Sequence, residues 1–260
     1  MTELYYFALS FFVYGFLGWC TEVAYAAAKQ GKFVNRGFLN GPICPVYGIG
    51  VGVVVQFLTP VENNLVLLYI SSTILVTVIE GITGFLLEKI FHNKWWDYSE
   101  QPLNIGGYVC VLFSLIWGVF CVLIVKIIHP LIYKVLTMIP LVLGIVVMAC
   151  LAVGLLADLY VTASGILKMN RRLEAMEKIA AELKELSDKV GENIYENVMA
   201  GMDFREEKKA RIEELKAKYE EMAENRTKVG ERLVKAFPKM QVGQHKEIFE
   251  ELRERIKRSK

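Results

Sequence analysis

Residues 141–172 read LVLGIVVMACLAVGLLADLYVTASGILKMNRR, and this stretch decides the fold class. A single charged residue, Asp158, interrupts the apolar run before Lys168, and two arginines follow shortly afterwards. About 20 apolar residues match the thickness of a bilayer, and a soluble core has no need of such a run. Basic residues at its end are typical of the cytoplasmic side of a membrane span. The stretch therefore predicts a transmembrane helix that leads into a soluble tail.

The distribution of charge divides the chain at the same place. Residues 1–168 carry eight basic and eight acidic side chains, whereas residues 169–260 carry 22 and 20. We therefore predict a transmembrane domain over residues 1–168 and a charged cytoplasmic helical tail over residues 169–260, and a single soluble globule is excluded. The net charge of +2 is too balanced to suggest a nucleic-acid partner.

Four further apolar segments precede this one, so the sequence predicts an all-α, polytopic membrane helix bundle with about five transmembrane helices in contact with the lipid bilayer. The first segment is too long for a cleaved signal peptide and lacks its basic start, so we expect a retained helix. The second segment is short and rich in glycine, and a helix break is expected at His129-Pro130, before the fifth segment. The expected spans cover about residues 4–28, a run ending at residue 60, and residues 65–87, 105–127 and 138–166.

Basic residues after the first, third and fifth spans indicate the orientation, with the N-terminus outside and the C-terminus in the cytoplasm. Lys126 and Lys134 disagree, because this topology places both of them outside. Alternatively, residues 38–60 enter and leave the membrane on one side, since non-helical backbone is tolerated at membrane depth where protein covers it. The basic residues that favour five spans are Lys29, Lys32, Arg36, Lys89, Lys94, Lys168, Arg171 and Arg172.

The tail repeats apolar residues at spacings of three and four, as on one face of a helix. The first such stretch comprises Leu173, Met176, Ala180, Leu183, Leu186 and Val190. Breaks are expected at Gly191, Gly201, Pro238 and Gly243, so the repeat is too short for a long coiled coil. We expect a few helices that pack on one another, on a second copy of the chain in a homo-oligomer, or on a cytoplasmic partner.

Three acids lie inside the apolar segments: Glu22, Glu80 and Asp158. Ionised groups are costly at membrane depth, so each is a candidate for ligand binding or gating. All three are expected roughly 10 to 15 Å from the basic flank of their helix, given the helical rise per residue. One interpretation is an acidic site that binds or relays a cation, or receives a basic group of a substrate. The other is that each acid has its own partner, which fixes helix packing.

Two polar loops, residues 29–44 and 91–104, are expected on the cytoplasmic side. Paired Trp95 and Trp96 suit the membrane interface, where one side of the ring is wet and the other apolar. Arg36 and Asp97 are candidates for a charge-assisted pair that closes a gate or seats a polar headgroup. Further hydrogen bonds are expected from Asn35, Tyr98 and Asn104.

Several common functional motifs do not occur in this sequence. It has no G-x-x-x-x-G-K-[ST] loop for ATP and neither G-x-S-x-G nor H-E-x-x-H, the hydrolase and zinc-protease signatures. Its three histidines have no metal-ligand spacing, and its five cysteines indicate no disulfide framework. No catalytic residue, cofactor or metal is therefore predicted.

Several motifs stand out in the apolar part: GWCTE at 18–22, NRGFL at 35–39, GPICPVYG at 41–48, WWDYS at 95–99, then Pro102, Asn104, Gly107, Ser114, Trp117 and Gly118. Together they resemble the bacterial family named ABC transporter type IV, also labelled CmpB-like permease. Tyr108 departs from the pattern, which has an arginine there. The resemblance implies an integral, multi-pass protein of the bacterial inner membrane and the membrane part of a transporter. Such a permease would need a separate ATPase subunit, with the charged tail as its docking surface.

Three functions follow from these observations. The first is a permease-like membrane component with a polar site near the cytoplasmic face. The second is a non-transporting scaffold or sensor whose tail recruits a partner. The third, less favoured, is a membrane enzyme acting on a lipid headgroup, with Arg36 binding phosphate and Asp97 as general base.

Overall fold

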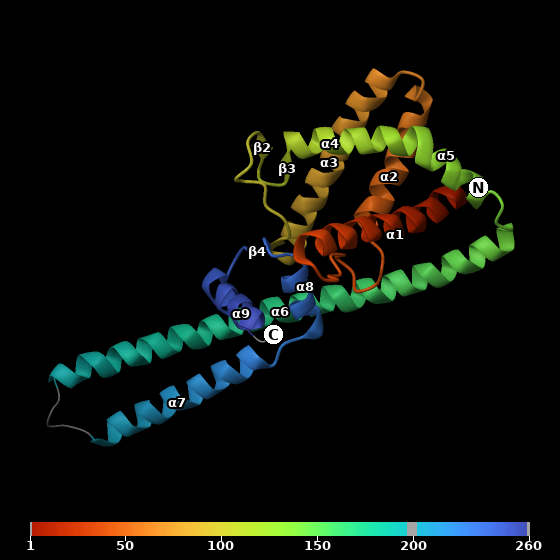
Figure 1. Cartoon of the computed structure of the whole chain (residues 1–260). Coiled ribbons are helices and arrows are strands. Elements are labelled where there is room, and N and C mark those ends of the chain that lie inside the picture. Colours follow the sequence, from red (N-terminus) through yellow and green to blue (C-terminus); the bar gives the residue numbers. More distant parts are fainter. Residues whose placement is uncertain (1, 197–201, 259–260) are drawn as a thin grey trace. The chain divides into compact units, whose positions relative to one another are not determined.

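The computed structural model describes residues 2–196 and 202–258, and helices make up most of them (Figure 1). The chain divides into two compact units. Unit 1 comprises Met1–Ala163 together with Arg232–Gln241, and unit 2 comprises Ser164–Glu231 together with Val242–Lys260. A segment of the sequence-predicted tail thus belongs to the unit that holds the apolar helices.

The apolar helices of unit 1 lie close to the predicted spans. Within the described part of the chain, four helices are long and apolar enough to cross a membrane: Glu3–Gln30, Leu65–Phe91, Val111–Leu136 and Leu141–Lys189. The elements of unit 1 are α1 (Thr2–Gln30), α2 (Pro45–Leu58), η1 (Thr59–Val61), α3 (Leu65–Phe91), β1 (Asn93–Lys94), β2 (Asn104–Ile105), β3 (Val109–Cys110), α4 (Val111–Leu123), η2 (Ile124–Ile128), α5 (His129–Leu136), the first part of α6 (Leu141–Glu196), the end of α8 (Lys228–Ala236) from Arg232 and Gln241 of β4 (Gln241–Val242).

The second predicted span corresponds to a shorter apolar helix, Pro45–Val61. Pro45 begins α2, where its missing N–H costs nothing, and Asn64 caps α3 by accepting a hydrogen bond from the Leu67 amide. Helix α2 packs against both α1 and α3, and Figure 1 shows α2 and α3 side by side, joined at the end away from the polar loops. The chain therefore passes along unit 1 five times, with α2 as the shortest pass, while the five-span topology stays a prediction.

The fourth predicted span begins later and ends later than the sequence indicated. Residues 104–110 form a β-hairpin in which Asn104 is opposite Cys110, and Gly106 and Gly107 take positive φ angles of 60° and 72°. The predicted break at His129-Pro130 is wrong. A π-helical turn, η2, immediately precedes Pro130, and such a widened turn accommodates a proline ring within a continuous helix.

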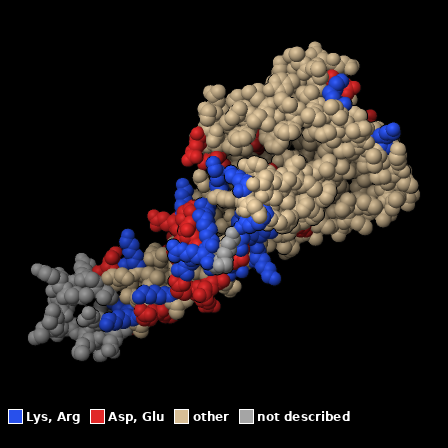
Figure 2. All heavy atoms as spheres, viewed as in Figure 1, with Lys and Arg blue, Asp and Glu red and all other residues tan. Residues whose placement is uncertain are grey.

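Close contacts between helices of unit 1 depend on glycine. A Cβ added at Gly18 would lie 2.3 Å from Tyr47, and one at Gly48 would lie 2.5 Å from the Phe11 carbonyl oxygen. These glycines allow α1 and α2 to approach closely, as small residues do in membrane proteins. Figure 2 shows few charges over the helices of unit 1 and many over the tail, and the large side chains exposed on α3, α4 and α6 are mostly apolar.

Unit 2 consists of the remainder of α6, α7 (Met202–Glu224), the start of α8 (Lys228–Ala236) and α9 (Lys246–Arg258). The predicted break at Gly191 is wrong, because α6 continues to Glu196, whereas the break predicted at Gly201 lies outside the described residues. Helix α8 does end before Pro238, and Gly243 does separate β4 from α9. Ion pairs join tail helices, Arg211 with Glu182 at 3.0 Å and Arg255 with Glu220 at 2.6 Å.

Candidate functional site at the polar loops

The two polar loops lie together at one end of unit 1. Phe38 of the first loop contacts Phe91 and Trp95, with ring centroids 5.8 and 5.2 Å apart. Trp95 is only 3% exposed, so protein covers its ring, and the position predicted for it at the membrane interface stays a prediction. Its ring is buried between aromatic neighbours and ties one loop to the other.

Glu22, on α1, has two partners from the first loop and the helix that follows it. Its carboxylate accepts a hydrogen bond of 2.7 Å from the Tyr47 hydroxyl and pairs with the Arg36 Nε at 3.2 Å. The Arg36 guanidinium also lies over the Tyr25 ring, 5.2 Å from its centroid. The carboxylate of Glu22 is therefore neutralised from the loop side.

Glu80, on α3, is less well satisfied. The Tyr98 hydroxyl donates to Glu80 Oε1 over 3.4 Å, and Oε2 is buried with no hydrogen-bond partner among the described residues. Burial raises the pKa of Tyr98, and the negative charges of Glu80 and then Glu22 raise it further, so the phenol stays protonated and donates. The Tyr98 ring stacks on Phe113 with centroids 5.0 Å apart, which fixes the hydroxyl against Glu80.

Asp158, on α6, orders the first loop. One carboxylate oxygen accepts from the Asn40 backbone amide at 3.1 Å and from its side-chain amide at 2.8 Å. The other accepts from the Gly41 amide at 2.6 Å, and the Thr162 hydroxyl donates to the first at 3.3 Å. Because charge-assisted bonds of this kind are short and strong, Asp158 acts as an anchor for the loop backbone.

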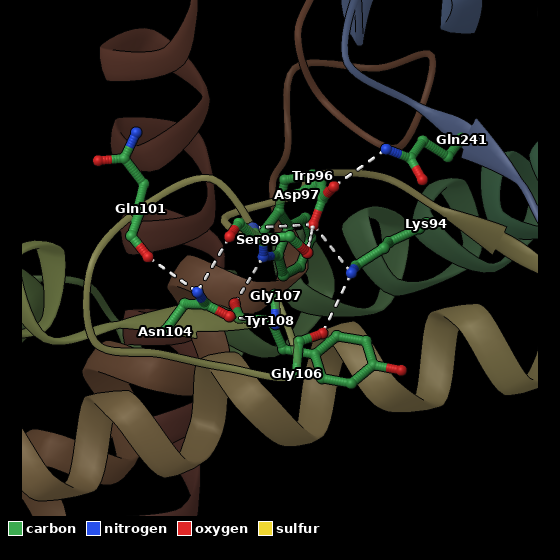
Figure 3. Close-up of polar contacts among 10 residues, drawn as sticks. All are labelled: Lys94, Trp96, Asp97, Ser99, Gln101, Asn104, Gly106, Gly107, Tyr108 and Gln241. Atoms are coloured by element: carbon green, nitrogen blue, oxygen red, sulfur yellow. Dashed lines mark hydrogen bonds and ion pairs between the residues drawn. The ribbon is translucent and has the colours of Figure 1, made fainter.

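Arg36 and Asp97, predicted as a pair, have different partners. Asp97 pairs with Lys94 at 2.9 Å, and it accepts from the Ser99 hydroxyl at 2.6 Å and the Gln241 side-chain amide at 3.0 Å (Figure 3). Burial opposes ionisation of Asp97, but the bonds from Ser99 and Lys94 outweigh it and lower its pKa to about 2. The prediction is wrong because each residue has an opposite charge close to it in its own region, Glu22 for Arg36 and Lys94 for Asp97.

The second loop is held by its own side chains. Asn104 donates from its amide to the carbonyls of Ser99 and Gln101, at 3.2 and 2.8 Å, and accepts from the Gly107 amide at 3.1 Å (Figure 3). Trp96 Nε1 donates to the Tyr108 carbonyl at 2.8 Å. These bonds give Trp96 and Asn104 structural roles within the loop.

Asn35 has a similar role in the first loop. Its side-chain oxygen accepts from Trp19 Nε1 at 2.8 Å and from the Gly37 amide at 3.0 Å, while its amide donates to the Asn40 carbonyl at 2.8 Å. The turn between residues 35 and 40 is therefore closed by one side chain.

Three residues of the predicted tail reach these loops and were missed by the sequence analysis. Arg232 donates to the carbonyls of Gly37 and Phe38, both at 2.8 Å, and to Asn40 Oδ1 at 3.0 Å. Phe237 contacts Trp95, with centroids 5.2 Å apart, and Gln241 donates to Asp97. Burial lowers the pKa of Arg232, and the nearby Asp158 partly offsets this. No pattern distinguishes Arg232 from the other cations of a tail rich in Lys and Arg.

The three acids do not meet at a single point. Glu22 and Glu80 are close enough for both charges to act on Tyr98, whereas Asp158 binds the backbone of residues 40–41. In the described part of the chain, no three His, Cys, Asp or Glu side chains are grouped so as to hold a metal ion. The arrangement thus comprises a Glu22–Glu80 region and a separate loop anchor at Asp158.

Comparison with known families places this region within one family. A sequence model of the family described as "Putative ABC-transporter type IV" matches residues 9–163. The match includes the three acids and both polar loops and leaves out Arg232–Gln241. No curated protein and no solved structure matches the chain.

Proposed function

The chain belongs to the family described as "Putative ABC-transporter type IV", and from this we propose that it is the permease-like membrane component of a transporter. Its long apolar helices make it a membrane protein. We further propose five passes through the bacterial inner membrane, with the N-terminus outside and the tail in the cytoplasm. The basic flanks of the first, third and fifth passes support this orientation.

The observation that best supports this proposal is the incomplete hydrogen bonding of Glu80. Its carboxylate is inside an apolar helix, one oxygen has a long bond to Tyr98, and the other is buried without a hydrogen-bond partner in the part of the chain that the structure describes. Buried polar groups are nearly always hydrogen-bonded, and an incompletely bonded acid at membrane depth marks a site for an ion, a proton or a basic group. Glu22 lies in the same region and is already paired with Arg36.

In this proposal Glu80 receives the cationic group, and Tyr98 and Glu22 adjust around it. The Arg36–Glu22 pair and the Tyr98–Glu80 hydrogen bond both join a loop residue to a helix acid. Movement of either loop would therefore change how the acids are neutralised. This coupling is what a gate at the cytoplasmic end of a transport path requires.

The test is purification of the intact chain from its native membranes. An affinity-tagged full-length protein extracted in mild detergent should retain an ATPase subunit, recognised by a P-loop in its sequence and by ATP hydrolysis of the purified complex. An unrelated multi-pass protein with the same tag is the control. Repeated recovery of the chain without any ATPase would contradict the permease proposal.

A scaffold or sensor is the second candidate, and one observation favours it. Glu22 and Asp158 each have their own partners, as expected if these acids fix packing. Under this alternative, Glu80→Gln would leave both partner binding and activity of the assembly unchanged. The lipid-headgroup enzyme is not proposed, because it needs Arg36 and Asp97 at one pocket and they have separate partners.

A further inference from the structure

Residues Arg232–Gln241 connect two polar loops that are distant in the sequence. At one end, the Arg232 guanidinium binds two carbonyls and one amide oxygen of residues 37–40. At the other end, Phe237 lies against Trp95 and Gln241 donates to Asp97, both in the second loop. Ten residues therefore hold both loops that carry the partners of Glu22 and Glu80.

Both ends of this segment continue directly into unit 2. Glu231 and Val242, its neighbours in the chain, are counted with unit 2, and α8 contributes residues to both units. A rearrangement of the tail therefore pulls on the segment from its two ends. Arg36 and Tyr98, which bind the two glutamates, belong to the loops that the segment holds.

We propose that Arg232–Gln241 is a releasable latch through which the tail controls the two polar loops. In the latched state the loops are held over the Glu22–Glu80 region, and release frees both loops together. The role of the latch rests on the proposed function, because the latch would regulate access to the Glu22–Glu80 region. The existence of the latch can be tested without that function, since its release changes the exposure of the loops in the isolated chain.

Two native cysteines report the exposure of the loops. Cys44, at the end of the first loop, is 5% exposed, and Cys110, in β3 opposite Asn104 of the second loop, is fully buried and within 3.5 Å of the Pro102 carbonyl. Cys121 is equally buried in the apolar cluster around Leu68. Alkylation by N-ethylmaleimide, followed at each cysteine by mass spectrometry, thus separates loop release from loss of the helix core.

The experiment compares the full-length chain with Arg232→Gln and Phe237→Ala. Because the latch releases as a unit, each substitution should speed alkylation of both Cys44 and Cys110, by about tenfold, and leave Cys121 unchanged. Arg258→Gln, which removes an exposed cation from α9, is the matched control and should change none of the three. Arg232→Lys keeps the charge but loses the forked contact, so it should be intermediate.

The electrostatic effect of Arg232→Gln on Cys44 slows alkylation, whereas loop release speeds it, so the two effects can be told apart. Burial, followed by the charge of Glu22, raises the pKa of Cys44 to about 12, and Arg232 is one of the groups that lower it. Removing that cation would raise the thiol pKa further and slow alkylation. Faster alkylation of Cys44 therefore reports exposure.

Two results would overturn the proposal. If Arg232→Gln affected Cys44 alone and Phe237→Ala affected Cys110 alone, the contacts would be local and no latch would exist. If Cys121 were exposed together with the others, the segment would be part of the core and not releasable. Neither readout involves an ATPase or transport, so failure of the latch and failure of the proposed function are distinguished.

Discussion

Asp158 shows how a single charge inside an apolar helix is stabilised. The backbone amides of Asn40 and Gly41 donate to its carboxylate, and Arg232 binds three oxygens of the same short loop. Two backbone N–H groups of the loop thus bind an anion, and two backbone carbonyl groups bind a cation. An ionised acid is tolerated inside an apolar helix because it has such partners.

Asp158→Asn should destabilise the protein. The amide keeps the shape of the side chain but loses the charge that accepts three N–H groups, at a cost of about 2 kcal/mol. This corresponds to a fall of roughly 5 °C in the Tm of the detergent-solubilised chain. Asp188→Asn, at an exposed position of the same helix, is the control. Equal Tm values for the two variants would contradict the anchoring role.

Asp97 gives the second loop a defined pH dependence. Its pKa is about 2, below the ordinary value of 3.8, so its stabilisation is fully present above pH 3.8 and is lost as the pH falls through 2. Fluorescence of Trp95 and Trp96 should therefore be constant between pH 8 and 5. Asp97→Asn should shift that emission at neutral pH, because Lys94 loses its acidic partner and keeps the Gly106 carbonyl. A wild-type transition near pH 6 would contradict this assignment.

The sequence identified the acids but not their partners. Glu22, Glu80 and Asp158 stand out because charges are rare in apolar segments. Arg36 pairs with Glu22 and not with Asp97 because of distances in the folded chain. The spacing of these residues along the sequence does not contain those distances. Arg232 was missed for a related reason, since its role depends on a long return of the chain.

At the scale of elements, packing of α1 against α2 depends on glycine at the contact. Gly48→Ala would place a Cβ 2.5 Å from a backbone oxygen of Phe11, so a helix must shift. We expect a loss of about 1 to 3 kcal/mol in stability, measured as a lower Tm in detergent. Gly154→Ala, where a Cβ meets nothing within 4 Å, should be neutral. Equal effects of the two substitutions would refute close packing at Gly48.

Helix α2 decides the topology. If it crosses the membrane, Lys32 of the first polar loop and Asn63 of the turn after it are on opposite sides, and both residues are exposed. Asn63→Cys in intact cells should react with a membrane-impermeant maleimide, whereas Lys32→Cys should react only after permeabilisation. Labelling of both from the same side would show that the segment between them re-enters.

Helix type was predictable from hydrophobic runs, whereas boundaries were not. The run of apolar residues continues from Ile105 into α4, but Gly106 and Gly107 favour a hairpin there. Pro130 looks like a helix break, yet the π-turn before it keeps the helix continuous. Both outcomes depend on local backbone geometry that apolar periodicity does not encode.

At the scale of the whole molecule, the division of charge predicted a transmembrane part over residues 1–168 and a charged helical tail over residues 169–260, and the described residues are mostly helical with four helices long and apolar enough to cross a membrane. What it did not indicate is that residues 232–241 return to the membrane unit. This return places part of the tail on the loops that carry partners of two membrane acids. If the tail docks an ATPase, these residues offer a route from that subunit to the Glu22–Glu80 region.

ATP hydrolysis by the purified complex tests the proposed permease role of the chain and of Glu80. The tagged full-length chain and its Glu80→Gln variant are each purified from native membranes, and turnover is compared at equal ATPase content. We expect that an ATPase accompanies both and that Glu80→Gln changes turnover about tenfold, while Glu100→Gln, at an exposed loop position, has no effect. Absence of an ATPase from both preparations, or identical turnover in all three proteins, would contradict it.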